Sequence, residues 1–295
     1  RQEPEEIICE PKAYLNELMM DDNSGQPSAK EVFDTTPYTI LVVDDNPDMT
    51  DFLKRTFEGY FKRIIIAGDG GEALQLVRSH VPDIIVSDVM MPRMNGYKLC
   101  KTIKENINIS HIPVILLTAR DDRQSQISGY KNGADGYLSK PFEVEMLMEL
   151  IRNRLKNREY TKKRYLNAGL IPTPEESTIS LTDETFLIKL NSIIQENIEN
   201  SNLGIQFICQ EVGLGRSSLY NKLKALTGMG ANEYISKLRI EKAITLISGT
   251  DMPFSEIAEK TGFTTPSYFS TAFKQYTGET PSQYKERKKK GLAGK

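Results

Sequence analysis

Histidine and cysteine are scarce in this chain of 295 residues, which contains two histidines and three cysteines. The cysteines lie about a hundred residues apart, which leaves no spacing typical of zinc ligands. They are Cys9, Cys100 and Cys209, and the histidines are His80 and His111. We expect the three thiols to be reduced and packed inside the protein, as in cytoplasmic proteins.

Long apolar runs are also missing. Stretches such as Ile40–Val43 and Val114–Leu117 are far shorter than the roughly 20 residues that a membrane helix requires, so we expect no membrane-spanning segment. The chain begins at Arg1 without a basic stretch followed by an apolar one. We therefore expect no secretion signal and a sequence that is cut from a longer protein.

Length and composition indicate a globular protein with two folded units. The chain has about twice the usual domain length, and its apolar (39%) and charged (26%) fractions are ordinary for globular proteins. The net charge of −2 conceals a gradient from the acidic residues 1–37 to the basic C-terminal end. The run Arg287–Lys290 can attract polyanions, although such a run taken alone is more often a solvated tail.

Changes in composition and in hydrophobic periodicity along the chain predict its division into domains. Residues 1–37 mix acidic residues with prolines and lack periodicity, as a tether does, apart from one short helix expected near Ala13–Met20. Two prolines and a glycine interrupt the helical spacing at Gly169–Pro174. The predicted units are an acidic tether at 1–37, a first domain at 38–157, a linker at 158–181, a helical domain at 182–290 and a tail at 291–295.

The first domain is predicted to be α/β, with a doubly wound sheet of five parallel strands. Strands are expected at Ile40–Val43, Ile64–Ala67, Ile84–Ser87, Val114–Thr118 and Tyr137–Ser139. Helices are expected at Asp48–Phe57, Glu72–Ser79, Gly96–Lys104, Arg123–Asn132 and Glu143–Lys156. Strict alternation of strands and helices implies a parallel sheet that is covered on both faces.

The second domain is predicted to be all-α. Thr182 is a suitable cap for a helix whose apolar residues from Phe186 to Ile198 fall on one face. A pattern then repeats after about fifty residues, which predicts two helix-turn-helix units. Its copies are Glu211–Gly213 with Ser217–Tyr220, and Lys260–Gly262 with Pro266–Phe269.

Polar side chains follow the predicted strands of the first domain. They are Asp44 and Asp45 after the first strand, Asp88 after the third, Thr118 at the end of the fourth and Lys140 after the fifth. Ligands of doubly wound sheets bind beyond the carboxyl ends of the strands, so we expect these groups to converge. Three carboxylates would repel one another, which argues for a hard cation, Mg²⁺. A lysine and a hydroxyl beside such a site can stabilise a transferring phosphoryl group.

Four segments of this domain resemble the response-regulator receiver domain. They are Ile40–Asn46, Asp83–Gly96, Pro113–Ala119 and Gly133–Phe142. The resemblance implies that Asp88 accepts a phosphoryl group from a histidine kinase. It also implies that Asp45, Asp88 and the Met90 carbonyl hold Mg²⁺, while Asp44 assists through water.

The same resemblance implies a switch. Lys140 would contact the phosphoryl oxygens, Thr118 would shift toward the new phosphate, and Tyr137 would swing inward behind it. These movements would remodel the face formed by the fourth helix, the fifth strand and the fifth helix. The alternative is that Tyr137 is a plain core aromatic, which is common on a last strand. Pro141 is expected to follow a cis bond, as in the family.

Two enzyme interpretations are weaker. Gly68–Ala73 matches the G-x-G-x-x-A dinucleotide fingerprint, but a nucleotide site leaves Asp44, Thr118 and Lys140 unexplained. In a hydrolase with an aspartyl nucleophile, a general acid ordinarily follows two residues later, where this chain has Met90. No phosphate-binding G-x-x-x-x-G-K is present in the sequence, so the phosphoryl group is expected to come from a donor outside this stretch.

The helical domain resembles the AraC/XylS-type DNA-binding domain, most closely in its second half. The matching positions are Ile257-Ala258, Gly262-Phe263, Ser267–Phe269, Phe273-Lys274, Gly278, Thr280-Pro281 and Tyr284. Thr265 before Pro266 is a favourable helix opening. The first half departs from the family at Cys209, Gly215 and Ala231, and Gly215 in place of the usual serine weakens the start of the first recognition helix.

In this family the second helix of each unit enters a major groove, and the pair reads one face of the duplex. The exposed candidates for DNA contact are Arg216, Ser217, Tyr220, Asn221 and Lys224 in the first unit, and Ser267, Tyr268, Thr271, Lys274 and Gln275 in the second. Asn221 is suited to pair with adenine, and Thr271 to touch a thymine methyl group. Each of them can also be plain solvated surface.

These features predict a phosphorylation-controlled transcription regulator rather than an enzyme. Its partners would be a histidine kinase, a double-stranded DNA operator and a second copy of itself after phosphorylation of Asp88. The chain also resembles the C-terminal end of hybrid two-component sensors, and in particular regulators of polysaccharide utilisation. We expect it to lie in the cytoplasm, either by itself or as the cytoplasmic end of a membrane-anchored hybrid sensor. A receiver that acts through protein partners, with the helical domain as an adaptor, is the alternative.

Overall fold

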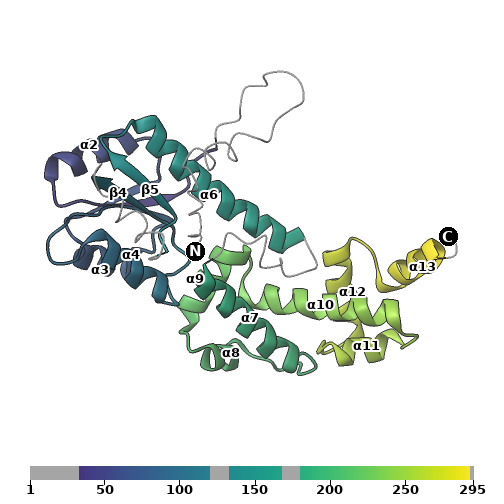
Figure 1. Ribbon diagram of the computed structural model, residues 1–295. Coiled ribbons are helices and arrows are strands. Elements are labelled where there is room, and N and C mark those ends of the chain that lie inside the picture. Colours follow the sequence, from purple (N-terminus) through teal and green to yellow (C-terminus); the bar gives the residue numbers. More distant parts are fainter. Residues whose placement is uncertain (1–32, 120–132, 168–179, 293–295) are drawn as a thin grey trace, which may run out of the picture. The chain divides into compact units, whose positions relative to one another are not determined.

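The computed structural model describes residues 33–119, 133–167 and 180–292 (Figure 1). Two of the predicted helices, Ala13–Met20 and Arg123–Asn132, lie outside these ranges. None of the helices within the described ranges is both long and apolar enough to cross a membrane.

A five-stranded parallel sheet forms the centre of the first domain. Its strands are β1 (Thr39–Val43), β2 (Arg63–Ala67), β3 (Ile84–Asp88), β4 (Val114–Ala119) and β5 (Gly136–Lys140). They pair in the order β2-β1-β3-β4-β5. Strands β1 and β3 are almost completely buried, because the near-continuous apolar runs pack between two helical layers. The predicted doubly wound sheet is therefore confirmed.

Side-chain caps explain where the first helices of this domain begin. Helix α2 (Pro47–Phe57) starts after Asn46, whose side chain accepts a hydrogen bond from the Asp48 amide. Helix α3 (Gly70–His80) starts earlier than the predicted Glu72, because the Asp69 carboxylate accepts from the Gly71 and Glu72 amides. Helix α4 (Gly96–Glu105) follows the cap Asn95.

The last helix of the domain corrects a predicted boundary. It was expected to end at Lys156, but α6 runs over Val144–Asn167, so residues 158–167 of the predicted linker are helical. One contact with β3's flanking segment and one contact within the helix stabilise this extension. Arg158 donates to the Asp83 carbonyl at 3.1 Å, and Lys162 pairs with Glu159 at 2.5 Å, one turn away along the helix.

Residues 180–292 form seven helices and contain no strand, in agreement with the predicted all-α class. They are α7 (Leu181–Glu196), α8 (Ile205–Val212), α9 (Arg216–Thr227), α10 (Ala231–Gly249), α11 (Phe254–Lys260), α12 (Pro266–Thr277) and α13 (Pro281–Leu292). Helix α13 continues past residue 290, so the first two residues of the predicted tail are helical. The three lysines just before them are good helix formers.

The start of α7 corrects the predicted cap. Ser180, rather than Thr182, precedes the helix and accepts a hydrogen bond from the Asp183 amide. Thr182 lies inside the first turn, and its hydroxyl instead donates to the Lys104 carbonyl at 3.0 Å. Sequence spacing does not show which of two neighbouring hydroxyl residues caps the helix. The long-range contact of Thr182 with Lys104 leaves Ser180 as the cap.

Two apolar clusters lie along α10, one for each helix-turn-helix unit. The first joins Tyr234 and Leu238 of α10 to α7, α8 and α9. The second joins Ala243 and Ile247 to α11, α12 and α13 around Phe269. The predicted pair of units and the cap Thr265 before α12 are confirmed.

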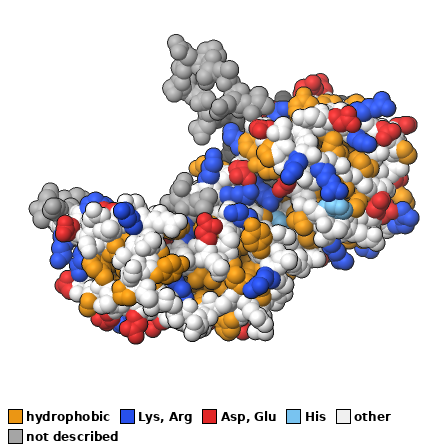
Figure 2. Space-filling view, turned by 180° about the vertical axis from the view of Figure 1, so that it is seen from behind, with side chains coloured by type: hydrophobic (Ala, Val, Ile, Leu, Met, Phe, Trp, Pro, Cys, Tyr) orange, Lys and Arg blue, Asp and Glu red, His pale blue; other side chains and the backbone are white. Residues whose placement is uncertain are grey.

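Large apolar side chains on the surface are dispersed among charged ones. Leu181 (79% exposed) and Tyr160 (64% exposed) are examples. On the face drawn in Figure 2, hydrophobic side chains alternate with Lys, Arg, Asp and Glu. Scattered apolar side chains of this kind are ordinary for a globular surface.

Candidate functional site

The carboxyl ends of β1, β3 and β5 bring two aspartates and a lysine together. Lys140 Nζ lies 2.8 Å from Asp44 Oδ2 and 2.5 Å from Asp88 Oδ1. The parallel register places these three strand ends at the same edge of the sheet. The Lys140–Pro141 peptide bond is cis, as expected.

Asp44 and Asp88 stabilise the charged form of Lys140. Partial burial alone would lower the pKa of its ammonium group, but hydrogen bonds and charge attraction from Asp44 and Asp88 outweigh this effect and raise the pKa. The ammonium group therefore stays protonated at neutral pH and offsets part of the negative charge of the two carboxylates.

Backbone groups fix the orientation of the Asp88 carboxylate. Its Oδ2 accepts a hydrogen bond from the Met90 amide at 2.6 Å, while its Oδ1 faces Lys140. The loop that follows folds back closely: a Cβ atom on Gly96 would stand 2.2 Å from the Asp88 carbonyl oxygen. Only glycine fits at this approach of α4 to β3.

The third predicted carboxylate stands apart from this contact. Asp44 is buried and accepts the Asn46 amide at 2.9 Å, whereas Asp45 is exposed. Within the described ranges, no three His, Cys, Asp or Glu side chains form a group that could hold a metal ion. The metal roles of Asp45, Asp44, Asp88 and Met90 remain predictions.

The two predicted switch residues lie on β4 and β5. Thr118 is 1% exposed, and its hydroxyl has no hydrogen-bond partner among the residues that the structure describes. Tyr137 pairs in register with Leu116 and packs against the core of the sheet. A buried hydroxyl without a partner is unfavourable, so Thr118 is suited to bind a group that arrives at the strand ends.

The predicted DNA-contacting residues share the exposed sides of α9 and α12. On α9 they are Arg216, Ser217, Tyr220, Asn221 and Lys224, and on α12 they are Ser267, Tyr268, Thr271, Lys274 and Gln275. The opposite sides carry the buried residues Leu219 and Leu223 of α9, and Phe269 and Phe273 of α12. Both helices thus expose polar and basic side chains to solvent on one side and pack apolar side chains into the core on the other.

Comparisons with known proteins show the family of each domain. A family model described as "response regulator receiver domain" matches residues 40–152, and one described as "helix-turn-helix domain" matches residues 208–287. The response regulator MprA of Mycobacterium sp. (strain KMS) is 36% identical over 165 residues, which cover 52% of this chain and 70% of MprA. The chain belongs to the response regulators. It contains a receiver domain followed by an AraC-type helix-turn-helix domain.

Other relatives match different portions of this response regulator. Histidine kinase P4 of Formosa agariphila is 41% identical over 249 residues, which are 84% of this chain but only 18% of that kinase. The DNA-binding response regulator MtrA of Mycolicibacterium smegmatis is 35% identical over 46% of this chain and 58% of its own length. The Francisella response regulator 1452 receiver domain has 38% identity and a TM-score of 0.37, and the match covers 41% of this chain and 98% of that one.

Helices α9 and α12 of the response regulator begin differently. The Thr265 hydroxyl accepts a hydrogen bond from the Tyr268 amide at the start of α12. Gly215 stands at the same place before α9 and provides no side-chain cap, as the sequence indicated. The first amides of α9 therefore lack a side-chain acceptor from the cap position.

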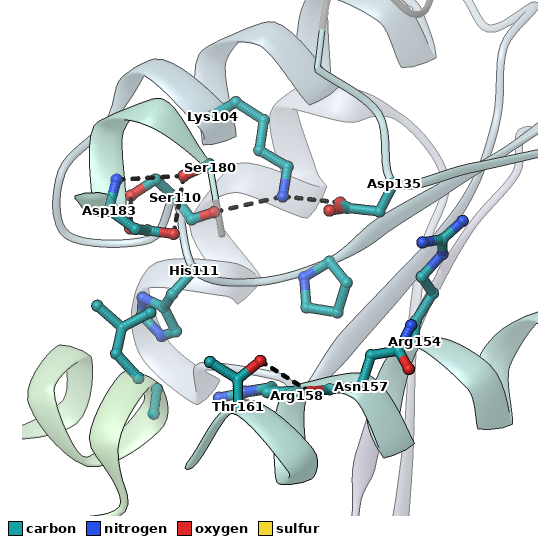
Figure 3. Close-up of a pocket in the computed structure, with 13 residues that line it drawn as sticks. Lys104, Ser110, His111, Asp135, Arg154, Asn157, Arg158, Thr161, Ser180 and Asp183 are labelled. Carbon is teal, nitrogen blue, oxygen red and sulfur yellow. Dashed lines mark hydrogen bonds and ion pairs between the residues drawn. The ribbon is translucent and has the colours of Figure 1, made fainter. Parts of the chain in front are cut away.

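The sequence patterns did not predict one buried polar cluster of the response regulator. Lys222 of α9 is completely buried and forms an ion pair with Asp183 of α7. Lys104 and Asp135 form a second pair at 2.7 Å, beside the cavity drawn in Figure 3. One signal was available for Lys222: it lies on the apolar stripe that also contains Leu219 and Leu223.

Proposed function

We propose that this response regulator is a phosphorylation-dependent, sequence-specific DNA-binding transcription regulator of a two-component phosphorelay. Asp88 accepts the phosphoryl group from a histidine kinase, and α9 and α12 bind a double-stranded DNA operator. The contact of Lys140 with both Asp44 and Asp88 is the observation that carries this proposal. It provides a nucleophilic carboxylate beside a fixed cation at the edge of the sheet where ligands bind.

The transfer needs one nucleophile and one neutralising group from the chain. An oxygen of the Asp88 carboxylate attacks the phosphorus atom, and the bond from phosphorus to the donor imidazole nitrogen breaks. The imidazole keeps the electron pair and takes up a proton, while Asp88 becomes an acyl phosphate. The Lys140 ammonium group stabilises the negative charge on the phosphoryl oxygens.

The residues at the site suit Mg²⁺. All candidate ligands are oxygen atoms, from the carboxylates of Asp45 and Asp88 and the Met90 carbonyl, with Asp44 assisting through water. The three aspartates carry more negative charge than Lys140 alone can balance, which favours a divalent cation. When bound, the ion would supply further neutralisation of phosphoryl charge.

Phosphorylation acts on the receiver domain as a population shift. The hydroxyl of Thr118 turns to a phosphoryl oxygen, and Tyr137 moves inward behind it, which changes the surface around β5 and α6. The phosphorylated receiver forms a homodimer that sets two DNA-binding domains on paired sites. Thr118 supports this role because its buried hydroxyl lacks a partner in the described ranges.

In DNA binding, α9 and α12 each enter a major groove. Asn221 pairs with adenine, Thr271 contacts a thymine methyl group, and basic residues such as Lys224 and Lys274 contact phosphates. The exposed positions of these side chains on both helices support this assignment.

The chain is proposed to be part of a hybrid sensor whose kinase lies in the same polypeptide. Its similarity to histidine kinase P4, of which it covers 18%, supports this assignment. The chain itself then has no enzyme activity beyond slow loss of its own phosphate. It lies in the cytoplasm, at the cytoplasmic end of a membrane-anchored sensor, and its resemblance to hybrid regulators favours genes for polysaccharide utilisation.

Phosphorylation and DNA binding can be tested on the same chain. Acetyl phosphate with Mg²⁺ should add one phosphoryl group to the wild-type chain and none to Asp88→Asn, as measured by mass spectrometry. A gel-shift assay with promoter fragments should show sequence-preferring, salt-sensitive binding that changes with phosphorylation. Phosphorylation without such binding would instead favour the adaptor function, in which the receiver acts through protein partners.

A further inference from the structure

Ser110 of the receiver domain contacts the first helix-turn-helix unit through two buried charged groups. Its hydroxyl donates to Asp183 Oδ1 at 2.7 Å and accepts from Lys222 Nζ at 2.8 Å. Ser110 and Lys222 are both 0% exposed, and Asp183 is 2% exposed. Buried charges are stable only when they are paired and hydrogen-bonded, so the three groups depend on one another.

The pairing sets the protonation of both charged groups. Burial works against ionisation of Asp183, but Lys222 and the two serine hydroxyls outweigh it and lower the pKa of the carboxylate. Burial also works against the charged form of Lys222 and lowers the pKa of its ammonium group, while the charge of Asp183 opposes that shift. Separation of the ion pair from the Ser110 hydroxyl would leave part of this hydrogen bonding unmade.

The contact continues into the receiver domain through Lys104. Lys104 Nζ binds Asp135 at 2.7 Å and the Ile112 carbonyl at 2.9 Å. The Lys104 carbonyl in turn accepts the Thr182 hydroxyl at 3.0 Å. Figure 3 shows Asp135, Lys104, Ser110 and Asp183 beside a cavity of about 80 Å³, which is also lined by residues of α6. Lys104 Nζ also donates to the Ser110 carbonyl at 3.3 Å, so contacts through Lys104 and Ser110 link Asp135, just before β5, to Lys222 in α9.

Apolar contacts accompany the polar ones. Ile107 packs against the apolar cluster of the first helix-turn-helix unit, and α6 packs against α9. Ala225 and Leu226 of α9 are buried together with Lys222. Apolar packing around a buried ion pair keeps water away from the pair and so favours a single arrangement.

The docked side of α9 differs from its predicted DNA-contacting side. Lys222 and Leu226 are buried, whereas Arg216, Asn221 and Lys224 remain exposed. Docking therefore leaves the candidate base-contacting residues uncovered. It attaches the helix that carries them to the segment that leads into β4, whose other end holds Thr118.

We propose that the receiver segment Lys104–Pro113 is a docking surface for the first helix-turn-helix unit, and that the Ser110–Asp183–Lys222 contact couples the phosphorylation state of the receiver to DNA binding by α9. This inference rests on the proposed function. The physical reason is that β4 joins the two ends of the path: Thr118 lies at its phosphoacceptor end, and Ser110 precedes its start. A shift of β4 upon phosphorylation changes the position of Ser110, and with it the position of α9.

The test is a substitution that cannot be accommodated at the contact. In the full chain, Ser110→Arg places a large cation at a fully buried position beside Lys222, so the two surfaces must separate. Asn108→Arg adds the same charge to the same segment at an exposed position and serves as the matched control. Thr182→Val removes only the hydrogen bond to Lys104 and provides a milder variant if Ser110→Arg does not fold.

Two readouts distinguish docking from coupling. Hydrogen exchange in peptides from α7 and α9 should be faster in Ser110→Arg than in the wild type and in Asn108→Arg, and equal protection in all three would overturn the docking surface. Operator dissociation constants are then measured with and without acetyl phosphate and Mg²⁺. The ratio of the two constants should fall to about one in Ser110→Arg, while Asp88 is still phosphorylated and Asn108→Arg keeps the wild-type ratio.

The outcomes separate this inference from the proposed function. An unchanged ratio in Ser110→Arg, together with faster exchange, would show that docking occurs but does not couple the two sites. A wild-type chain that binds the operator equally well with and without phosphorylation would overturn the proposed function and the coupling. The exchange measurement would still decide whether the docking surface exists.

Discussion

Lys140 and Asp88 are 52 residues apart in the chain, yet the ammonium nitrogen of one lies 2.5 Å from a carboxylate oxygen of the other. Because both residues end strands of the same parallel sheet, the sheet brings them to the same edge. The contact leaves Asp88 with a cation on one oxygen and the Met90 amide on the other. This fixed orientation suits the proposed attack of Asp88 on an incoming phosphoryl group.

Replacement of Lys140 should slow phosphorylation of Asp88. Lys140→Met keeps most of the side-chain length but removes the positive charge, so the rate with acetyl phosphate should fall by about 100-fold, as for loss of one charge-stabilising donor. The rate is measured by intact-mass spectrometry over time. Lys101→Met, at an exposed position on α4, should leave the rate unchanged. An unaltered rate in Lys140→Met would remove Lys140 from the proposed transfer.

Gly96→Ala should destabilise the receiver domain. The added Cβ would stand 2.2 Å from the Asp88 carbonyl oxygen and 3.0 Å from the Val89 Cα atom, and the backbone there cannot give way easily. We expect a loss of about 1–3 kcal/mol in the free energy of unfolding, measured with urea. Gly249→Ala, at the exposed end of α10, is the control, because nothing lies within 4 Å of its added Cβ. Equal stability of the two variants would contradict the close approach.

Stability should fall in mild acid because of His111. Burial, assisted by the charges of Arg158, Lys222 and Lys104 and opposed by Asp183, lowers the pKa of His111 to about 3. Between pH 6.5 and 5 the unfolded chain therefore takes up a proton that the folded chain does not accept. The free energy of unfolding should decrease by at most about 1.4 kcal/mol per pH unit from this group.

This pH dependence is assigned by substitution of each histidine. His111→Asn should flatten the dependence measured by urea unfolding between pH 6.5 and 5. His80→Asn is the control, since His80 is exposed and is the only other histidine in the chain. If the slope persists in His111→Asn, another group is responsible.

Asn221→Ala should weaken binding to the operator far more than binding to unrelated DNA. A bidentate contact with adenine contributes about 1–3 kcal/mol of discrimination, and alanine removes it without changing the charge. The comparison variant is Lys224→Ala on the same exposed side of α9, which should weaken binding to both DNAs alike and reduce the salt dependence. Both are measured by fluorescence anisotropy at several salt concentrations. Equal losses on the two DNAs for Asn221→Ala would mean that Asn221 reads no base.

The sequence by itself determined the parallel sheet and most of the proposed phosphoacceptor site. Apolar strand runs bounded by polar residues leave one arrangement for Asp44, Asp88 and Lys140, since each follows a strand of the same sheet. The start of α12 was equally local, because Thr265 and Pro266 are adjacent.

Tertiary structure alone decided the length of α6, the cap of α7 and the partners of Lys222. Ser110 lies 73 residues from Asp183 and 112 from Lys222, so no local periodicity reports their contact. In the sequence, Lys222 of α9 resembles a residue that contacts DNA. Only the neighbours that pack around it show that its ammonium group forms a buried ion pair instead. The physical reason is that local patterns record which side of a helix is apolar, whereas the pairing of buried charges depends on which distant segments meet.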